Sequence, residues 1–223
     1  EGKGIRVEHG RVLGVSLMDG APMDSDFVIS NADYKTTFLK LIDPLTIPSK
    51  CYHAVLKAKQ TGSVLQVCLG VNADRVDLSS FDKASRLIYR RDPGSFEREE
   101  EIDWNVVELN PETLARQELE VCLWSKEDKT LAPDGCAVIV IRTEAICYHF
   151  ARYRSVFRKR HPDYNEHKIR LGRALIRELE NLIPGLEKAV LVMDVATPLT
   201  FEDQGGRSEG AVAGWSWDYE DFF

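Results

Sequence analysis

The sequence predicts an α+β fold, with a mixed, largely antiparallel sheet covered by helices. Short β-branched runs alternate with turn dipeptides at the start of the chain, and long apolar runs follow in its middle. A helical pattern with apolar residues at 3–4 spacing then precedes a last apolar run. The 223 residues are 43% hydrophobic and 29% charged, so the chain has enough apolar side chains for a buried core.

The start of the chain is expected to form a β-meander. The predicted strands are 5–8, 11–17 and 26–30. A His-Gly and an Asp-Gly dipeptide separate them at places that suit hairpin turns. Asn31 or Asp33 is then expected to cap a helix over residues 34–42, because both side chains can accept bonds from the free amides of a first helical turn.

Longer apolar runs predict one sheet in the rest of the chain. Residues 63–71 are almost wholly apolar, which is typical of a central strand buried on both faces. Strands at 119–125 and 136–142, joined by a polar hairpin, are expected to pair with it. The clearest helix covers 165–182. Further predicted elements are a helix at 49–59, a weak strand at 86–89 and a last strand at 189–195.

The charge and the cysteines narrow the classes of function. A net charge of −7 argues against nucleic acid as a partner, and no apolar run approaches the roughly 20 residues that span a bilayer. The five cysteines are odd in number and lack Cys-x-x-Cys spacing. This pattern predicts reduced thiols in a cytoplasmic protein and no metal site.

A basic segment at 147–161 is predicted to be helical. It carries arginine, lysine and histidine side chains in close succession. Such a stripe is most often a solvated helix face, but it could also contact an anionic membrane surface or a cofactor phosphate. Peripheral membrane contact is therefore an alternative to a purely cytoplasmic location.

The tail combines a strand stop with clustered glycines and tryptophans. The last predicted strand runs into Thr197 and Pro198, and proline biases the residue before it to extended geometry. The clustered residues are Gly205, Gly206, Gly210, Gly214, Trp215 and Trp217. Glycines permit positive φ or a close approach of the backbone. Two interpretations follow: a surface loop anchored by tryptophan, or a loop that faces a ligand.

Motifs for the common kinds of enzyme chemistry are absent from the sequence. It lacks Gly-x-Ser-x-Gly, the P-loop, His-Glu-x-x-His and the Gly-x-Gly-x-x-Gly of dinucleotide folds. No carboxylate lies in an evident apolar pocket that would raise its pKa. The sequence therefore predicts no catalytic residue, and the chain alone is not expected to bind a dinucleotide phosphate in the usual way.

The order of the segments resembles the C-terminal part of flavin-dependent oxidoreductases of the phytoene desaturase, carotenoid isomerase and retinol saturase type. The segments that carry the resemblance are 10–20 with 26–33, 125–135, 179–186 and 196–214. The last is the most specific, because it joins Ala-Thr-Pro-Leu-Thr to spaced glycines. The first is shared more widely by two-domain flavoproteins. Together they cover most of the chain in the order of the family.

The resemblance implies the substrate-binding part of an enzyme in which FAD carries the hydride chemistry. The implied parts are a flavin-domain meander at 1–33, a substrate domain at 34–200 and a return segment at 201–223. The substrate would be apolar and polyene-like, and carotenoids, retinoids and other apolar molecules all suit it. Residues implied near the cofactor are Thr197, Pro198, Gly206, Gly210 and Gly214. Residues implied near the substrate are Thr200, Trp215 and Trp217, although the two tryptophans could instead be packed in the core.

The chain begins at Glu1 and ends on two phenylalanines. We interpret it as a piece of a longer protein whose glycine fingerprint and closing flavin-site segment lie outside it. Alone it is therefore expected to be inactive and to hold no FAD. Two other hypotheses are a non-catalytic binding or scaffold module, and a membrane-surface protein that acts through residues 147–161.

Overall fold

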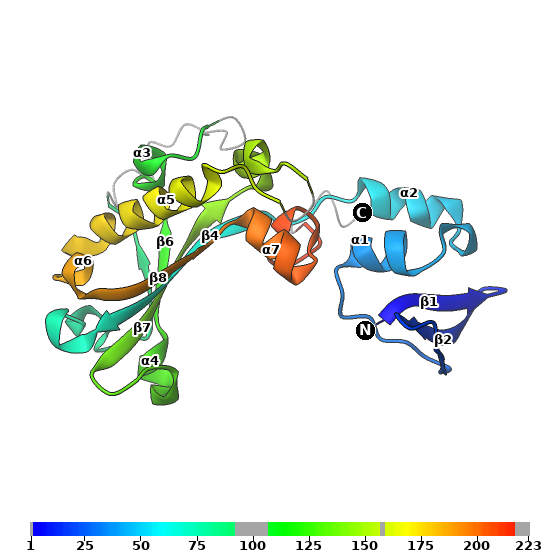
Figure 1. Ribbon diagram of the computed structural model, residues 1–223, viewed down its shortest axis with the longest axis horizontal. Helices are drawn as coiled ribbons and strands as arrows, with labels where there is room; N and C mark the ends of the chain where they lie inside the picture. The colour runs from blue at the N-terminus through cyan, green and yellow to red at the C-terminus, as the bar shows by residue number, and fades with distance from the viewer. Residues whose placement is uncertain (1, 92–106, 157–158, 217–223) are drawn as a thin grey trace. The chain divides into compact units, whose positions relative to one another are not determined.

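The computed structural model of the chain has the predicted α+β class (Figure 1). The residues that the structure describes are 2–91, 107–156 and 159–216. The chain divides into two compact units. We call Glu1–Gly62 with Phe201–Phe223 the meander unit, and Ser63–Thr200 the sheet unit. The assignment of 1–33, 34–200 and 201–223 to flavin and substrate roles stays a prediction.

The sheet unit is built on a five-stranded sheet with strand order β5-β6-β7-β4-β8. The strands are β4 (Ser63–Asn72), β5 (Arg86–Tyr89), β6 (Leu119–Leu123), β7 (Cys136–Ala145) and β8 (Val190–Ala196). All neighbouring strands are antiparallel. The predicted single sheet is confirmed. The direct pairing of 119–125 with β4 is wrong, because β7 lies between β6 and β4.

Helices cover one face of this sheet. The helices of the sheet unit are α3 (Pro111–Leu114), α4 (Trp124–Glu127), α5 (Tyr164–Glu178) and α6 (Leu186–Ala189). Its 3-10 turns are η3 (Ala73–Arg75), η4 (Ser79–Phe81), η6 (Lys129–Leu131), η7 (Cys147–Tyr153) and η8 (Leu179–Asn181). α3 and α5 lie on the same side of the strands (Figure 1).

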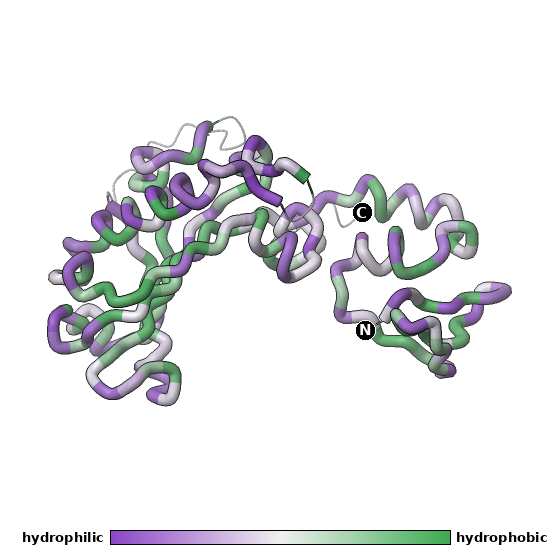
Figure 2. Tube along the Cα trace, in the orientation of Figure 1, coloured by the Kyte–Doolittle hydropathy of each residue, from purple (hydrophilic) through white to green (hydrophobic). Residues whose placement is uncertain are grey.

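Burial alternates along β4 because helices cover one face of the sheet. Leu65, Val67 and Leu69 point to the helices and are at most 1% exposed. The residues between them, such as Gln66 and Cys68, are half-buried. The prediction of burial on both faces is therefore wrong, because alternate side chains of a strand point to opposite faces. Figure 2 shows hydrophobic residues along the strands of the sheet unit.

α5 supplies the packing layer over the sheet. Leu171 and Leu175 are fully buried, whereas Ile169, which the predicted stripe included, is 37% exposed. A Cβ atom on Gly172 would lie 2.8 Å from Cγ2 of Val195, so the glycine lets α5 approach β8 closely. The predicted helix at 165–182 is confirmed, with its last turn formed by η8.

His167 on α5 is a buried histidine that is expected to stay neutral. Its ring stacks on Tyr153 with centroids 4.8 Å apart, and its Nδ1 lies 3.2 Å from a guanidinium nitrogen of Arg170. Burial, followed by the charges of Arg170 and Arg152, lowers the pKa of His167 from 6.5 to about 4, and Glu108 opposes this shift weakly.

The free energy of unfolding should therefore depend on pH through His167. The unfolded chain binds a proton near pH 6.5 while the folded chain does not, so stability is lost as the pH falls from 6.5 toward 4. His167→Phe keeps the ring packing and should flatten urea-unfolding midpoints across this window. His161→Phe, at a side chain 54% exposed, is the control and should leave the slope intact. An unchanged slope in His167→Phe would contradict the assignment.

The basic segment at 147–161 is not a single helix, which corrects the prediction. η7 ends at Tyr153, and Arg154 then forms an isolated antiparallel bridge with Arg160. Phe150 and Tyr153 are both buried, at 0% and 7% exposure. Residues three apart lie on one side of a 3-10 helix, so this tighter turn buries both aromatic rings. Contact of this segment with a membrane stays a prediction. The continuous basic helix on which that prediction was based is not formed by the described residues.

β8 is an edge strand, and this position explains its exposed side chains. Leu191 and Val192 are 60% and 65% exposed, although they belong to an apolar run. The outward backbone groups of Val195 are covered. Its N–H donates to Oδ1 of Asp194 at 2.9 Å, and its carbonyl accepts from Nζ of Lys168 at 3.0 Å. Such cover protects an edge against pairing with another strand.

The meander unit contains a small antiparallel sheet and several short helices. Its strands are β1 (Gly2–Glu8), β2 (Arg11–Leu17) and β3 (Pro22–Asp24). Its helical segments are α1 (Tyr34–Thr36), the π-turn η1 (Thr37–Leu41), the 3-10 turn η2 (Pro44–Thr46), α2 (Ser49–Lys57) and the 3-10 turn η9 (Ser208–Gly210). Asp33 caps α1 by accepting from the amide of Thr36 at 2.9 Å, as predicted.

The predicted third strand at 26–30 is wrong. The turn after β2 places Pro22 opposite Ser16, so residues 22–24 take the pairing positions on β2. Residues 26–30 are outside the strands, and Phe27 and Ile29 are 86% and 97% exposed. Within the described part of the chain, Val55 and Ala211 are the only buried hydrophobic residues of the meander unit. This unit therefore has little core of its own.

Candidate functional site

The Thr-Pro pair marks the end of β8 and the start of α7 (Pro198–Gly205). The sequence predicted a loop here, and the helix is a correction. Proline suits the first position of a helix because its missing N–H has no partner there in any case. The amide of Thr200 donates to the carbonyl of Thr197 at 2.8 Å, and the amide of Thr197 donates to Oγ1 of Thr200 at 3.1 Å. The first turn of α7 is thus held by one backbone hydrogen bond and one side-chain hydrogen bond.

A tyrosine that the sequence analysis did not select holds this turn. The Tyr164 hydroxyl lies 2.6 Å from Oγ1 of Thr197 and 3.3 Å from Oγ1 of Thr200. Tyr164 is 6% exposed and Thr197 is fully buried. The bonded hydroxyls lie 33 and 36 residues apart in the sequence, so no local pattern joins them.

The glycine-rich tail runs along the segment before β4. The carbonyl of Gly214 accepts from the amide of Thr61 at 2.9 Å, and the amide of Val212 donates to the carbonyl of Gly62 at 3.2 Å. Trp215 bridges to Gln60. The φ angles of Gly206, Gly210 and Gly214 are +63°, +68° and +88°. These backbone turns account for the glycines structurally, and their contact with a flavin stays a prediction.

Trp215 lies against Tyr34. The two ring centroids are 3.7 Å apart with planes at 39°, and Trp215 is still 41% exposed. Burial, with the nearby charges of Asp33 and Glu209, raises the pKa of Tyr34 to about 12. Trp215 is therefore a partly open aromatic surface, so the alternative that it is packed in the core is wrong, and its contact with a substrate stays a prediction. Trp217 lies outside the described residues.

The predicted site residues fall into two groups. Thr197, Pro198 and Thr200 belong to the sheet unit. The glycines of the tail and Trp215 belong to the meander unit, where Oγ1 of Thr36 donates to the carbonyl of Gly206 at 3.3 Å. Each group is ordered by contacts within its own unit. Their assignment to cofactor and substrate stays a prediction.

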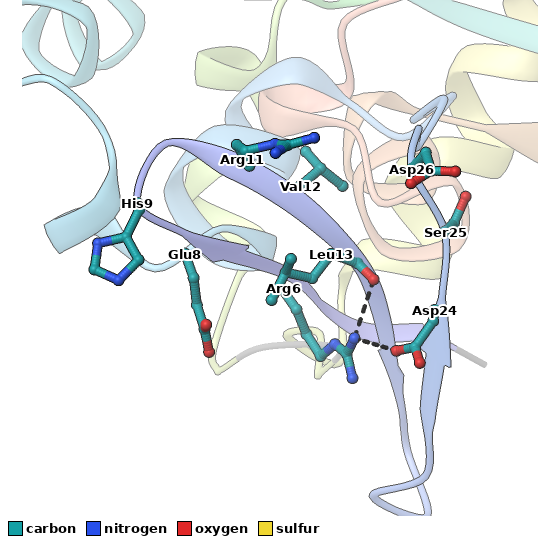
Figure 3. A pocket seen from close by; sticks show the side chains of 9 residues that line it. All are labelled: Arg6, Glu8, His9, Arg11, Val12, Leu13, Asp24, Ser25 and Asp26. Atoms are coloured by element: carbon teal, nitrogen blue, oxygen red, sulfur yellow. Dashed lines mark hydrogen bonds and ion pairs between the residues drawn. The ribbon is translucent and has the colours of Figure 1, made fainter.

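A hollow of about 720 Å³ lies on the meander (Figure 3). Arg6 donates to the carbonyl of Leu13 at 3.0 Å and pairs with Asp24 at its centre. The residues that line this hollow are Arg6, Glu8, His9, Arg11, Val12, Leu13, Asp24, Ser25 and Asp26. A second hollow of about 350 Å³ is lined partly by Glu108, His149 and Arg152. Both linings carry charged side chains, and neither includes a predicted site residue.

The described residues offer neither a metal cluster nor a membrane-spanning helix. Among residues 2–91, 107–156 and 159–216, no three His, Cys, Asp or Glu side chains cluster as metal ligands. In the same residues, no helix has the length and apolar character to cross a membrane.

The described residues do not fit the phosphate part of FAD. Dinucleotide folds hold the pyrophosphate at a glycine-rich turn between a parallel strand and a helix. Strand pairs in both sheets described here are antiparallel, and the sequence has no Gly-x-Gly-x-x-Gly. A flavin held near this chain would need that turn from elsewhere.

Comparison with solved structures gives the class of fold. The chain is similar to a crystal structure of an oxidoreductase from Methanosarcina mazei, with a TM-score of 0.51 and 16% sequence identity. The match covers 87% of this chain and 36% of that one. The fold described above is therefore shared with part of a larger oxidoreductase.

Curated relatives narrow this class. The chain is 26% identical over 209 residues to a chloroplastic prolycopene isomerase of Daucus carota, and 26% identical to that of Arabidopsis thaliana, over 93% of its length. It is 25% identical to pyridine nucleotide-disulfide oxidoreductase domain-containing protein 2 of Mus musculus over 87% of its length. No protein-family model matches. The predicted resemblance to carotenoid isomerase-type oxidoreductases is confirmed, and the chain spans about a third of the length of these relatives.

Proposed function

We propose that this chain is the substrate-binding part of a flavin-dependent oxidoreductase that acts on an apolar, polyene-like substrate. The observation that carries the proposal is the similarity to two prolycopene isomerases over 93% of the chain. The absence of nucleophile and acid-base motifs from the sequence supports it, because a flavin cofactor supplies the redox chemistry in such enzymes.

The exposed surface of the meander unit also supports the proposal. Phe27 and Ile29 are almost fully exposed on an extended segment, and Leu45 is 94% exposed. Exposed apolar side chains that gather into a patch mark surfaces that contact another part of a protein, and we assign Phe27 and Ile29 to such a surface. The rest of a two-domain flavoprotein is the partner that the relatives suggest, since this chain spans about a third of their length.

Within that enzyme, the residues of this chain would bind and orient the substrate and exclude water. Thr200 offers a hydroxyl at the first turn of α7, and Trp215 offers an aromatic face. Neither residue carries redox chemistry, which FAD would supply when bound by the whole protein. The hydrogen-bonded turn at Thr197 and Pro198 would hold the Thr200 hydroxyl in one position.

Binding of retinol, a fluorescent apolar polyene, tests the proposal on this chain. We expect saturable binding with energy transfer from tryptophan to retinol. Trp215→Ala should weaken binding by about fivefold, because stacking on an aromatic face contributes roughly 1 kcal/mol. Trp124→Ala is the matched control, since Trp124 is 38% exposed, close to the 41% of Trp215. It should leave retinol binding unchanged.

Three outcomes bear on the proposal. Saturable binding that depends on Trp215 supports it, whereas no binding of retinol by the wild-type chain rejects it. The purified chain is also expected to leave a desalting column without the flavin absorbance band. A yellow protein would contradict the expectation that this chain holds no FAD by itself.

A further inference from the structure

Three side chains at four-residue spacing contact the end of β8 and the Thr-Pro turn that follows it. They are Arg160, Tyr164 and Lys168. A guanidinium nitrogen of Arg160 donates to the carbonyl of Leu199 at 3.0 Å. The Tyr164 hydroxyl bonds Thr197 and Thr200, and Nζ of Lys168 donates to the carbonyl of Val195 in β8 at 3.0 Å. The turn is thus held at Thr197, Leu199 and Thr200, and the strand that leads into it is held at Val195.

The three side chains also support one another. The Arg160 guanidinium lies 5.6 Å from the centre of the Tyr164 ring, and Nζ of Lys168 lies 5.8 Å from it. Cations at this range are attracted to an aromatic face. The tyrosine ring therefore lies between two charged groups whose donors are already directed at the turn, and its own position is fixed by burial at 6% exposure.

We propose that Tyr164, with Arg160 and Lys168, is a positioning residue that fixes the hydroxyl of Thr200 and the first turn of α7 for substrate binding. The proposal rests on the proposed function for the link to the substrate. The claim that these side chains hold the turn rests on the contacts alone. Thr200 both accepts from the amide of Thr197 and contacts Tyr164, so a shift of the phenol would release the hydroxyl that the proposed function assigns to substrate binding.

Tyr164→Phe tests this role, and Tyr153→Phe is its matched control. Tyr153 is also a buried tyrosine, at 7% exposure, but its hydroxyl accepts from Arg152 at 2.8 Å and not from the turn. Loss of the Tyr164 hydroxyl should speed amide exchange of Thr197 and Thr200 by about fivefold or more, as expected for one lost hydrogen bond. Exchange in β4 and β7 should not change.

Retinol affinity gives the functional readout. Tyr164→Phe and Thr200→Val should each weaken it by about fivefold, and the double variant should be no weaker than either, because both act through one contact. Tyr153→Phe should bind retinol as the wild type does.

The two proposals fail in different ways. Unchanged exchange at Thr197 and Thr200 in Tyr164→Phe, or an equal change in Tyr153→Phe, overturns the positioning role. Faster exchange with unchanged retinol affinity overturns its link to the substrate. A wild-type chain that binds no retinol overturns the proposed function, while the exchange measurement still decides whether Tyr164 holds the turn.

Discussion

Gly185→Ala is expected to lower the free energy of unfolding of the sheet unit by about 2–4 kcal/mol. Gly185 lies between η8 and α6 with a φ of +86°, where an L side chain is strained. A Cβ atom there would lie 2.5 Å from the backbone carbonyl oxygen of Arg75. A backbone atom cannot rotate away as a side chain can, so the strain and the clash add.

Gly135→Ala separates these two causes. Gly135 also has a positive φ, of +74°, but the nearest atom to its Cβ would be Oδ2 of Asp74 at 4.0 Å. Gly135→Ala should therefore lower the free energy of unfolding only by the backbone strain, about 1 kcal/mol. Urea unfolding of the two variants gives the difference. Equal losses would show that the approach of Arg75 contributes nothing.

The strands of the sheet unit could be predicted because each is a local apolar run. β4, β6 and β7 were found within a few residues of their observed ends. The segment at 26–30 has the same composition and was predicted wrongly, since a strand also needs a partner and residues 22–24 hold that place on β2. The composition of a segment indicates only its tendency to be extended. Pairing depends on the geometry of the turn before it.

The helical errors have a related cause. The basic segment at 147–161 was predicted as one helix from its composition, but the burial of Phe150 and Tyr153 selects a 3-10 turn that stops at Tyr153. α7 was missed because a Thr-Pro pair was interpreted as a stop, although proline also begins helices. Both segments lie where tertiary contacts override local preference.

The candidate site, like the strands and helices, could be predicted only in part from the sequence. The Thr-Pro turn and the positive-φ glycines have local sequence patterns, and the structure places them at a closed turn and a paired tail. Tyr164 had no such pattern, since its partners are more than 30 residues away. Tyr164 and Lys168 share one face of α5, but Arg160 lies before the helix and beyond Pro162, so helical spacing could not have joined all three.

Arg91→Met is expected to lower the free energy of unfolding by about 3 kcal/mol, because it leaves a buried carboxylate without its cation. The Glu178 side chain is 5% exposed. It accepts from Nε of Arg91 at 2.7 Å and from the Tyr89 hydroxyl at 3.3 Å. Urea unfolding measures the loss.

The neighbouring arginine supplies the control. Arg90 pairs with Glu118, whose side chain is 45% exposed, so Arg90→Met should cost less than about 1 kcal/mol. The double variant Arg91→Met with Glu178→Gln should be more stable than Arg91→Met alone, because the buried group is then uncharged. If the double variant is the less stable of the two, an uncompensated charge is not what Arg91 prevents. If instead the double variant recovers stability, the adjacent arginines of this chain differ in effect through the burial of the carboxylates they meet, 5% exposed at Glu178 and 45% at Glu118. This burial depends on tertiary packing, so the two ion pairs cannot be ranked from sequence.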